Sequence, residues 1–151
     1  MPDRPPRGKK VEIDTSCYIP YLNHPSPQDP HPLTRLIFEN TEHLSAVVLA
    51  ELRAGAYRPV DAKRLEALRR LFQARSRLLA PTFTDWDLAG EVLARLRRKF
   101  YLEGKGLSRL FSDVLIALSA RRIGAVVVTS NRADFERIRA CYGFELYLWE
   151  G

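Results

Sequence analysis

Four acidic residues in apolar surroundings are the part of this chain with the clearest chemical meaning. They are Asp14, Glu51, Asp113 and Asp134. Each lies at the edge of, or inside, a segment that otherwise has the composition of a protein core, where charges are rarely placed without a partner. Two carboxylates about 5 Å apart repel each other by roughly 3 kcal/mol at an effective dielectric near 20. A fold that gathers all four would need a divalent cation or protons, so the pattern indicates a metal-dependent hydrolytic site.

Short apolar runs and helical spacings alternate along the chain. Strands are expected at residues 11–14, 43–46, 78–82, 125–129 and 144–149, and helices at 17–22, 33–40, 47–56, 61–75, 85–99, 110–122 and 132–142. This alternation predicts an α/β fold with a parallel sheet of four to five strands flanked by helices in three layers. Sites in such sheets lie at the carboxyl ends of the strands.

The expected elements bring the four acids toward that edge. Asp14 ends the first strand and Glu51 follows the second. Asp134 follows the run 125–129, and Asp113 lies on the helix that leads into it. Four separate segments could therefore converge on one edge of the sheet.

Local signals give further expectations about helix ends and about the core. Thr15 or Ser16 can cap the first helix, which Pro20 should limit, and Thr84 is expected to cap the helix 85–99. Residues 101–107 are expected to form a loop. The core is expected to include Trp86, Leu88, Val92 and Leu96.

Length and composition restrict the possible classes of protein. The chain has 151 residues, 46% of them hydrophobic, and no apolar run near the ~18 residues of a membrane span. Residues 1–9 are predicted to be a flexible basic arm, and residues 10–151 a single domain. Without an apolar signal segment at the start, a cytoplasmic location is expected. Cys17 and Cys141 do not have the spacing of a disulfide framework or a zinc site.

The formal net charge of +6 suggests a polyanionic partner, with nucleic acid as the leading candidate. A solvated surface rich in arginine is the alternative explanation. The cluster Arg95, Arg97, Arg98 and Lys99 can be interpreted in either way.

Four motifs together resemble those of the PIN domain family, and more narrowly its VapC toxin branch. They are Ile13–Ser16, Ser45–Gly55, Asp113–Ala117 and Val128–Phe135, and the resemblance spans almost all of residues 11–149. Each motif alone is weak, and their order and spacing carry the comparison. The Pro-rich loop 23–32 and the arm 1–10 depart from the usual pattern of the family.

The resemblance implies a nuclease domain with Mg²⁺- or Mn²⁺-dependent endoribonuclease activity and an RNA substrate. Asp14, Glu51, Asp113 and Asp134 match the acidic quartet of the family, as catalytic and metal-binding residues. Thr129 and Asn131 match supporting polar positions. The family further implies a homodimer and a small antitoxin, as in a type II toxin–antitoxin pair. Hard cations of this kind take oxygen ligands.

Other interpretations remain open at this point. Each acid could instead cap a helix or lie near the amino-terminal end of one, where the helix dipole stabilises a negative charge. Thr129 and Asn131 could be ordinary turn residues. A PIN nuclease that processes RNA outside any toxin pair is the nearest alternative function, and a catalytically silent module that binds RNA or an antitoxin is another. A receiver-like phosphoacceptor domain is disfavoured, partly because Glu12 is expected to point away from Asp14.

Overall fold

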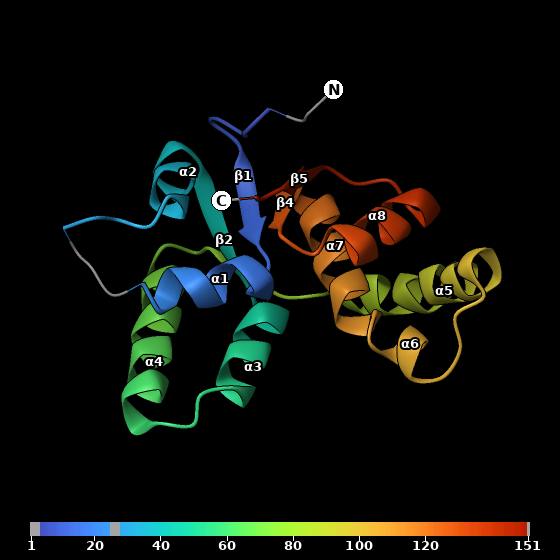
Figure 1. Cartoon of the computed structure of the whole chain (residues 1–151), viewed down its shortest axis with the longest axis horizontal. Helices are drawn as coiled ribbons and strands as arrows, with labels where there is room; N and C mark the ends of the chain where they lie inside the picture. Colours follow the sequence, from blue (N-terminus) through green and yellow to red (C-terminus); the bar gives the residue numbers. More distant parts are fainter. Residues whose placement is uncertain (1–3, 25–27, 151) are drawn as a thin grey trace.

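The computed structural model describes residues 4–24 and 28–150 (Figure 1). Residues 1–3, 25–27 and 151 lie outside the described residues. The start of the predicted basic arm and the centre of the Pro-rich loop are among them.

Five parallel strands form the sheet, in the order β3-β2-β1-β4-β5. The strands are β1 (Lys10–Ile13), β2 (Thr41–Ser45), β3 (Leu78–Leu79), β4 (Val126–Thr129) and β5 (Leu146–Leu148). The central pair β1 and β4 aligns Ile13 with Val128. Their carboxyl ends therefore lie side by side, and the predicted parallel α/β sheet is confirmed.

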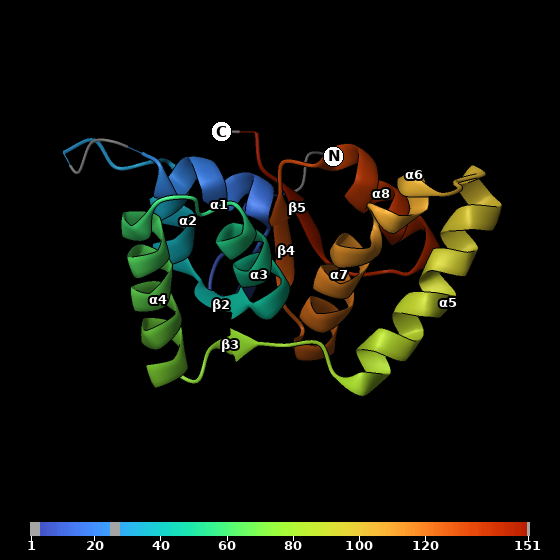
Figure 2. The same cartoon turned by 90° about the horizontal axis from the view of Figure 1, so that it is seen from below.

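Eight helices flank the sheet among the described residues. They are α1 (Thr15–Leu22), α2 (Leu33–Glu39), α3 (Ala46–Ala54), α4 (Pro59–Ala74), α5 (Phe83–Phe100), α6 (Lys105–Ser108), α7 (Phe111–Ile123) and α8 (Arg132–Cys141). Helices α1–α4 gather on one side of the molecule and α5–α8 on the other (Figure 2). Helix α4 packs against β2 and β3, and α7 packs against β1 and β4. None of these helices is long and apolar enough to cross a membrane.

The core explains why the central strands are so apolar. Val126, Val127 and Val128 of β4 are buried, because β1 and β5 pair with the two edges of this strand and helices α1 and α7 pack against it. Helix α7 contributes an unbroken buried run from Val114 to Ala120. This run fixes the helix against the sheet, so the first turn of α7 is held near the strand ends.

Several local expectations are wrong. Helix α1 begins at Thr15 and runs through Pro20, so neither Thr15 nor Ser16 caps it. Thr82 rather than Thr84 caps α5, because Thr82 and Asp85 form a reciprocal capping box. The expected loop 101–107 contains the start of α6. Trp86 is 51% exposed, whereas Val92 and Leu96 are buried as expected.

Part of the segment predicted to be a flexible arm contacts the domain. The Gly8 amide donates to the Glu39 carbonyl (2.9 Å), and the Asn40 side chain donates to the Pro6 carbonyl (2.8 Å). Pro6 is buried, and Gly8 adopts φ +63°, a conformation that favours glycine. Residues 6–9 therefore pack beside the junction of α2 and β2. Flexibility of the arm stays a prediction.

Candidate active site

Asp14 lies directly after β1, where two hydroxyl groups hold its carboxylate. Ser16 Oγ and Thr129 Oγ1 each donate to Asp14 Oδ2 at 2.8 Å. The side chain of Asp14 makes no capping bond to α1, although it occupies the N-cap position. Asp14 is 4% exposed and, among the described residues, Oδ1 accepts no hydrogen bond. The carboxylate is therefore oriented by neighbours from β4 and α1 and keeps one oxygen for a ligand.

Glu51 lies on α3, after β2, and is tied to α1. Thr15 Oγ1 donates to Glu51 Oε1 at 2.9 Å. Partial burial raises the pKa of Glu51, the Thr15 hydrogen bond lowers it, and the charge of Asp14 raises it further. The hydrogen bond to Thr15, the residue directly after Asp14, places the Glu51 side chain at the carboxyl edge of the sheet.

Asp113 lies in the first turn of α7, immediately before the buried run of that helix. Burial raises the pKa of Asp113 to about 8, and the charges of Asp14, Asp134 and Glu51 add to the effect. Arg109 acts in the opposite direction. Among the described residues, no hydrogen bond reaches this carboxylate. Asp113 is therefore the acid of the quartet whose ionisation the fold opposes most clearly.

Asp134 lies in the first turn of α8 and has the largest set of polar partners. Asn131 caps the helix through the Asp134 amide, and its Nδ2 donates to Asp134 Oδ2 at 3.0 Å. Two guanidinium groups approach the other oxygen: Arg109 and Arg137 each lie 3.9 Å from Oδ1. Asn131 therefore positions the carboxylate, and the two arginines offset its charge.

The supporting residues form one network around the end of β4. The Asn131 amide donates to Thr129 Oγ1 at 3.0 Å, and the Ser130 amide donates to Ser16 Oγ at 3.1 Å. Thr129 is fully buried. Motif reasoning included Thr129 and Asn131 but missed Ser16, Thr15 and Arg109 as members of the site. A hydroxyl two residues after Asp14 was the available signal for Ser16.

The donor set suits a hard divalent cation, although the side chains are not gathered around one point. Carboxylate oxygens are the ligands that Mg²⁺ and Mn²⁺ prefer. Within residues 4–24 and 28–150, no three His, Cys, Asp or Glu side chains lie close enough to hold one metal ion. The four acids nevertheless share one electrostatic neighbourhood, because three of them raise the pKa of the fourth. They would hold an ion together only after the side chains move closer.

A fifth acid, Glu12, lies beneath Asp14 in the interior. The expectation that Glu12 points away from Asp14 is wrong, because residues two apart on a strand share a face. Glu12 is fully buried, and neither of its carboxylate oxygens has a hydrogen-bond partner among the described residues. Burial raises its pKa well above the ordinary range, and the charge of Asp14 adds to the effect. Glu12 therefore favours the protonated state.

The fold and the site define the class of protein. The sequence profile of the PIN domain family matches residues 11–140. The chain belongs to the PIN domain family, and the resemblance seen in the motifs is confirmed. PIN domains are generally nucleases and typically use divalent metal ions.

Solved structures narrow the comparison. The chain is similar to VapBC2 from Rickettsia felis, bound to a DNA fragment from its promoter, with 24% identity, a TM-score of 0.66 and coverage of 93% of this chain and 99% of that one. The chain is also similar to DNA-bound VapBC from Salmonella typhimurium, with 29% identity, a TM-score of 0.63 and coverage of 93% of this chain and 98% of that one. For VapBC-1 from nontypeable Haemophilus influenzae the identity is 21% and the TM-score 0.62, and the match covers 94% of this chain and 99% of that one. A search of curated protein sequences found no match.

Proposed function

We propose that this protein is a metal-dependent endoribonuclease and the toxin of a type II toxin–antitoxin pair. Membership of the PIN family and the 29% identity to VapBC from Salmonella typhimurium support this function. The net charge of +6 suits a polyanionic substrate such as RNA. In this proposal Asp14, Glu51, Asp113 and Asp134 bind Mg²⁺ or Mn²⁺.

The position of Asp113 carries the proposal, because this carboxyl lies in the first turn of α7, partly buried and beside the other three acids. Its pKa of about 8 reflects burial together with the charges of the other three acids. A fold gains nothing in stability from such a group near neutral pH, because the folded state opposes its ionisation. Structural ion-pair networks also shift pKa values, but Asp113 has no salt bridge among the described residues. A perturbed carboxyl at the carboxyl edge of a parallel sheet is typical of a functional site.

The residues around the acids have separate tasks in this proposal. Ser16 and Thr129 fix the orientation of Asp14 through its Oδ2. Asn131 fixes Asp134, and Arg109 lies beside it with a largely exposed side chain that can meet a substrate phosphate. A bound divalent ion would polarise a phosphoryl oxygen and activate water for attack.

The partner in this proposal is a small antitoxin. A cavity of about 280 Å³ lies among α1, α3 and α4, and Glu51 is part of its lining. Apolar side chains, Ile19, Leu22, Leu52 and Leu65, share that lining with Arg58 and Arg64. An antitoxin segment seated there would lie beside one of the four acids. This position would couple binding of the partner to access to the site.

We also propose a homodimer. The rings of Trp86 and Phe111 form a tilted pair with centroids 5.5 Å apart while remaining 51% and 36% exposed. Exposed aromatic pairs of this kind often mark protein contacts. Light scattering on the purified chain tests the dimer, and a monomer at micromolar concentration would contradict it.

Cleavage of a labelled RNA with Mg²⁺, with Mn²⁺ and with chelator tests the nuclease. Internal cuts that require metal are expected. Growth arrest on expression, relieved by the product of the adjacent gene, would support the toxin. Cleavage without such a gene would favour an RNA-processing nuclease instead. Stoichiometric Mn²⁺ binding without RNA turnover would contradict the nuclease and favour a catalytically silent module.

A further inference from the structure

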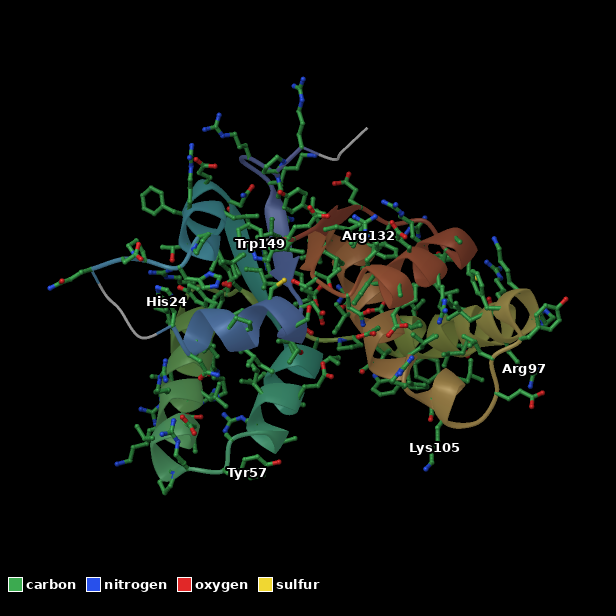
Figure 3. All side chains as sticks on the ribbon, in the orientation of Figure 1. His24, Tyr57, Arg97, Lys105, Arg132 and Trp149 are labelled. Atoms are coloured by element: carbon green, nitrogen blue, oxygen red, sulfur yellow. The ribbon has the colours of Figure 1, made fainter. Side chains whose placement is uncertain are left out.

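A second cavity, of about 580 Å³, lies apart from the four acids. It is formed by the basic arm, α2 and the end of β5. Its polar and aromatic lining consists of Arg4, Arg7, Arg35, Glu39, Tyr147 and Trp149. Trp149 lies over the sheet, far from Arg97 and Lys105 at the α5–α6 end of the molecule (Figure 3).

The charge of this cavity is positive. Three arginines face one carboxylate, which gives 3 − 1 = +2. Glu39 accepts from Arg35 at 3.0 Å and from Arg7 at 3.3 Å, and these bonds lower its pKa. One carboxylate thus orients two guanidinium groups without neutralising both. The Arg4 side chain adds a third cation at the rim.

Two aromatic rings complete the lining. Tyr147 and Trp149 are two residues apart in and just beyond β5, so they lie on the same face of the sheet. Both are only partly buried. Aromatic rings beside arginines are a combination that binds single-stranded nucleic acids, since bases stack on the rings and phosphates pair with the guanidinium groups.

Backbone contacts connect this cavity to the acidic site. The Trp149 amide donates to the Thr129 carbonyl at 2.8 Å, and Ser130 Oγ donates to the Trp149 carbonyl at 3.1 Å. Thr129 also donates a hydrogen bond to Asp14, so a single residue, Thr129, connects Trp149 to the proposed catalytic edge. At the other end, the bonds of Pro6 and Gly8 to Asn40 and Glu39 fix the arm as a wall of the cavity.

We propose that this cavity, which we call the arm groove, binds single-stranded RNA that flanks the cleavage site. This inference rests on the proposed ribonuclease function and adds where the substrate is held. A base stacks on Trp149 and Tyr147, and Arg4 and Arg35 contact phosphates. The groove contributes affinity and leaves bond cleavage to the acids.

Fluorescence anisotropy of a labelled single-stranded RNA, measured in chelator, tests binding without cleavage. Trp149→Ala should weaken affinity about tenfold, and Trp149→Phe should restore most of it. The logarithm of the binding constant falls linearly with the logarithm of the salt concentration. Arg4→Ala should make this slope shallower by about 0.7, the value for one phosphate contact on a single strand. Lys105→Ala, an equal change of charge at an exposed position of α6, should alter neither affinity nor slope by as much.

Fluorescence of variants with a single tryptophan gives an independent readout. The chain has two tryptophans, so Trp86→Phe leaves only Trp149. In chelator, RNA should quench the tryptophan fluorescence of this variant. It should not quench the fluorescence of Trp149→Phe, which retains Trp86. Wild-type affinity in both Trp149→Ala and Arg4→Ala would overturn the arm groove. Loss of binding to a protein partner, with RNA binding unchanged, would overturn it in favour of a protein-binding surface. RNA binding in chelator with no cleavage in metal would retain the groove and overturn only the nuclease function.

Discussion

Thr129 and Asp14, 115 residues apart in the sequence, are joined by a hydrogen bond of 2.8 Å between Thr129 Oγ1 and Asp14 Oδ2. The same threonine oxygen accepts from the Asn131 amide at 3.0 Å. One buried hydroxyl thus links the acid after β1 to the turn that leads into α8. This link fixes Asp14 relative to the segment that carries Asp134.

Removal of this hydroxyl should weaken both the site and the fold. Thr129→Val keeps the shape of the side chain but leaves the Asn131 amide without its acceptor and Asp14 with Ser16 alone. An unsatisfied buried polar group costs about 1–3 kcal/mol, so the unfolding free energy should fall by roughly that amount. The Mg²⁺ concentration needed for half-maximal cleavage should rise. Urea denaturation and a metal titration measure the two effects. Thr129→Ser retains the hydroxyl, and equal losses in both variants would contradict this role.

Burial of Asp113, together with repulsion from the other acids, should limit the stability of the metal-free protein. Folding raises the pKa of Asp113 from an ordinary value of 3.8 to about 8, so the folded state binds the extra proton between these values. Stability therefore falls as pH rises through this window. Asp113→Asn should raise the melting temperature in chelator at pH 8.5 by several degrees and change it little at pH 4.

Metal should produce the complementary effect. Mg²⁺ or Mn²⁺ should raise the melting temperature of the wild type by binding the native state, and less so in Asp113→Asn. Asp87→Asn, a change in an exposed acid of α5, serves as the matched control. Asp14 and Asp134 are poorer choices for this test, because each accepts hydrogen bonds that a neutral side chain would weaken. A lower midpoint for Asp113→Asn at pH 8.5 would show that the carboxylates do not repel.

A second pH effect should come from Glu42, on β2. Burial raises the pKa of Glu42 to about 7, although the Tyr18 hydroxyl, 3.0 Å from Oε1, lowers it. The folded state thus retains a proton that the unfolded state loses near pH 4.5, and stability falls as pH rises toward 7. Glu42→Gln should remove up to about 1.4 kcal/mol per pH unit of this slope.

Urea denaturation in chelator at several pH values from 4.5 to 7.5 measures the slope. Glu39→Gln is the control of opposite sign, because Arg7 and Arg35 lower the pKa of that partly exposed carboxyl. Loss of the Glu39 carboxyl should not flatten the curve of unfolding free energy against pH. Parallel curves for wild type and Glu42→Gln would indicate that Glu42 is already ionised near pH 5.

The sequence predicts the sheet well because apolar runs such as Val126–Val128 have few alternatives to a central strand. It also predicts which segments carry the acids to one edge, since parallel strands place their carboxyl ends together. Helix starts were less predictable. Thr82 and Thr84 have equal intrinsic ability to cap α5, and the reciprocal bond with Asp85 decides between them.

Details that depend on packing could not be predicted from one sequence. The exposure of Trp86 follows from the way α5 crosses α7, which local periodicity does not specify. Arg109 is an ordinary basic residue in the sequence, and only the fold brings it within 3.9 Å of Asp134. Glu12 differs from these residues, because strand alternation alone places it on the same face as Asp14.

Single-turnover cleavage of RNA by Asp113→Asn tests the central claim most directly. Asn keeps the size of the side chain at the start of α7 but loses the charge that would hold the metal, so the circular dichroism spectrum should stay native. Mutation of a residue that only supports a metal ligand typically lowers activity about 10–100-fold. The cleavage rate of Asp113→Asn in Mg²⁺ or Mn²⁺ should fall by more than this. Asp87→Asn should cleave at the wild-type rate. A folded Asp113→Asn variant that cleaves near the wild-type rate in Mg²⁺ would contradict the assignment of this acidic quartet.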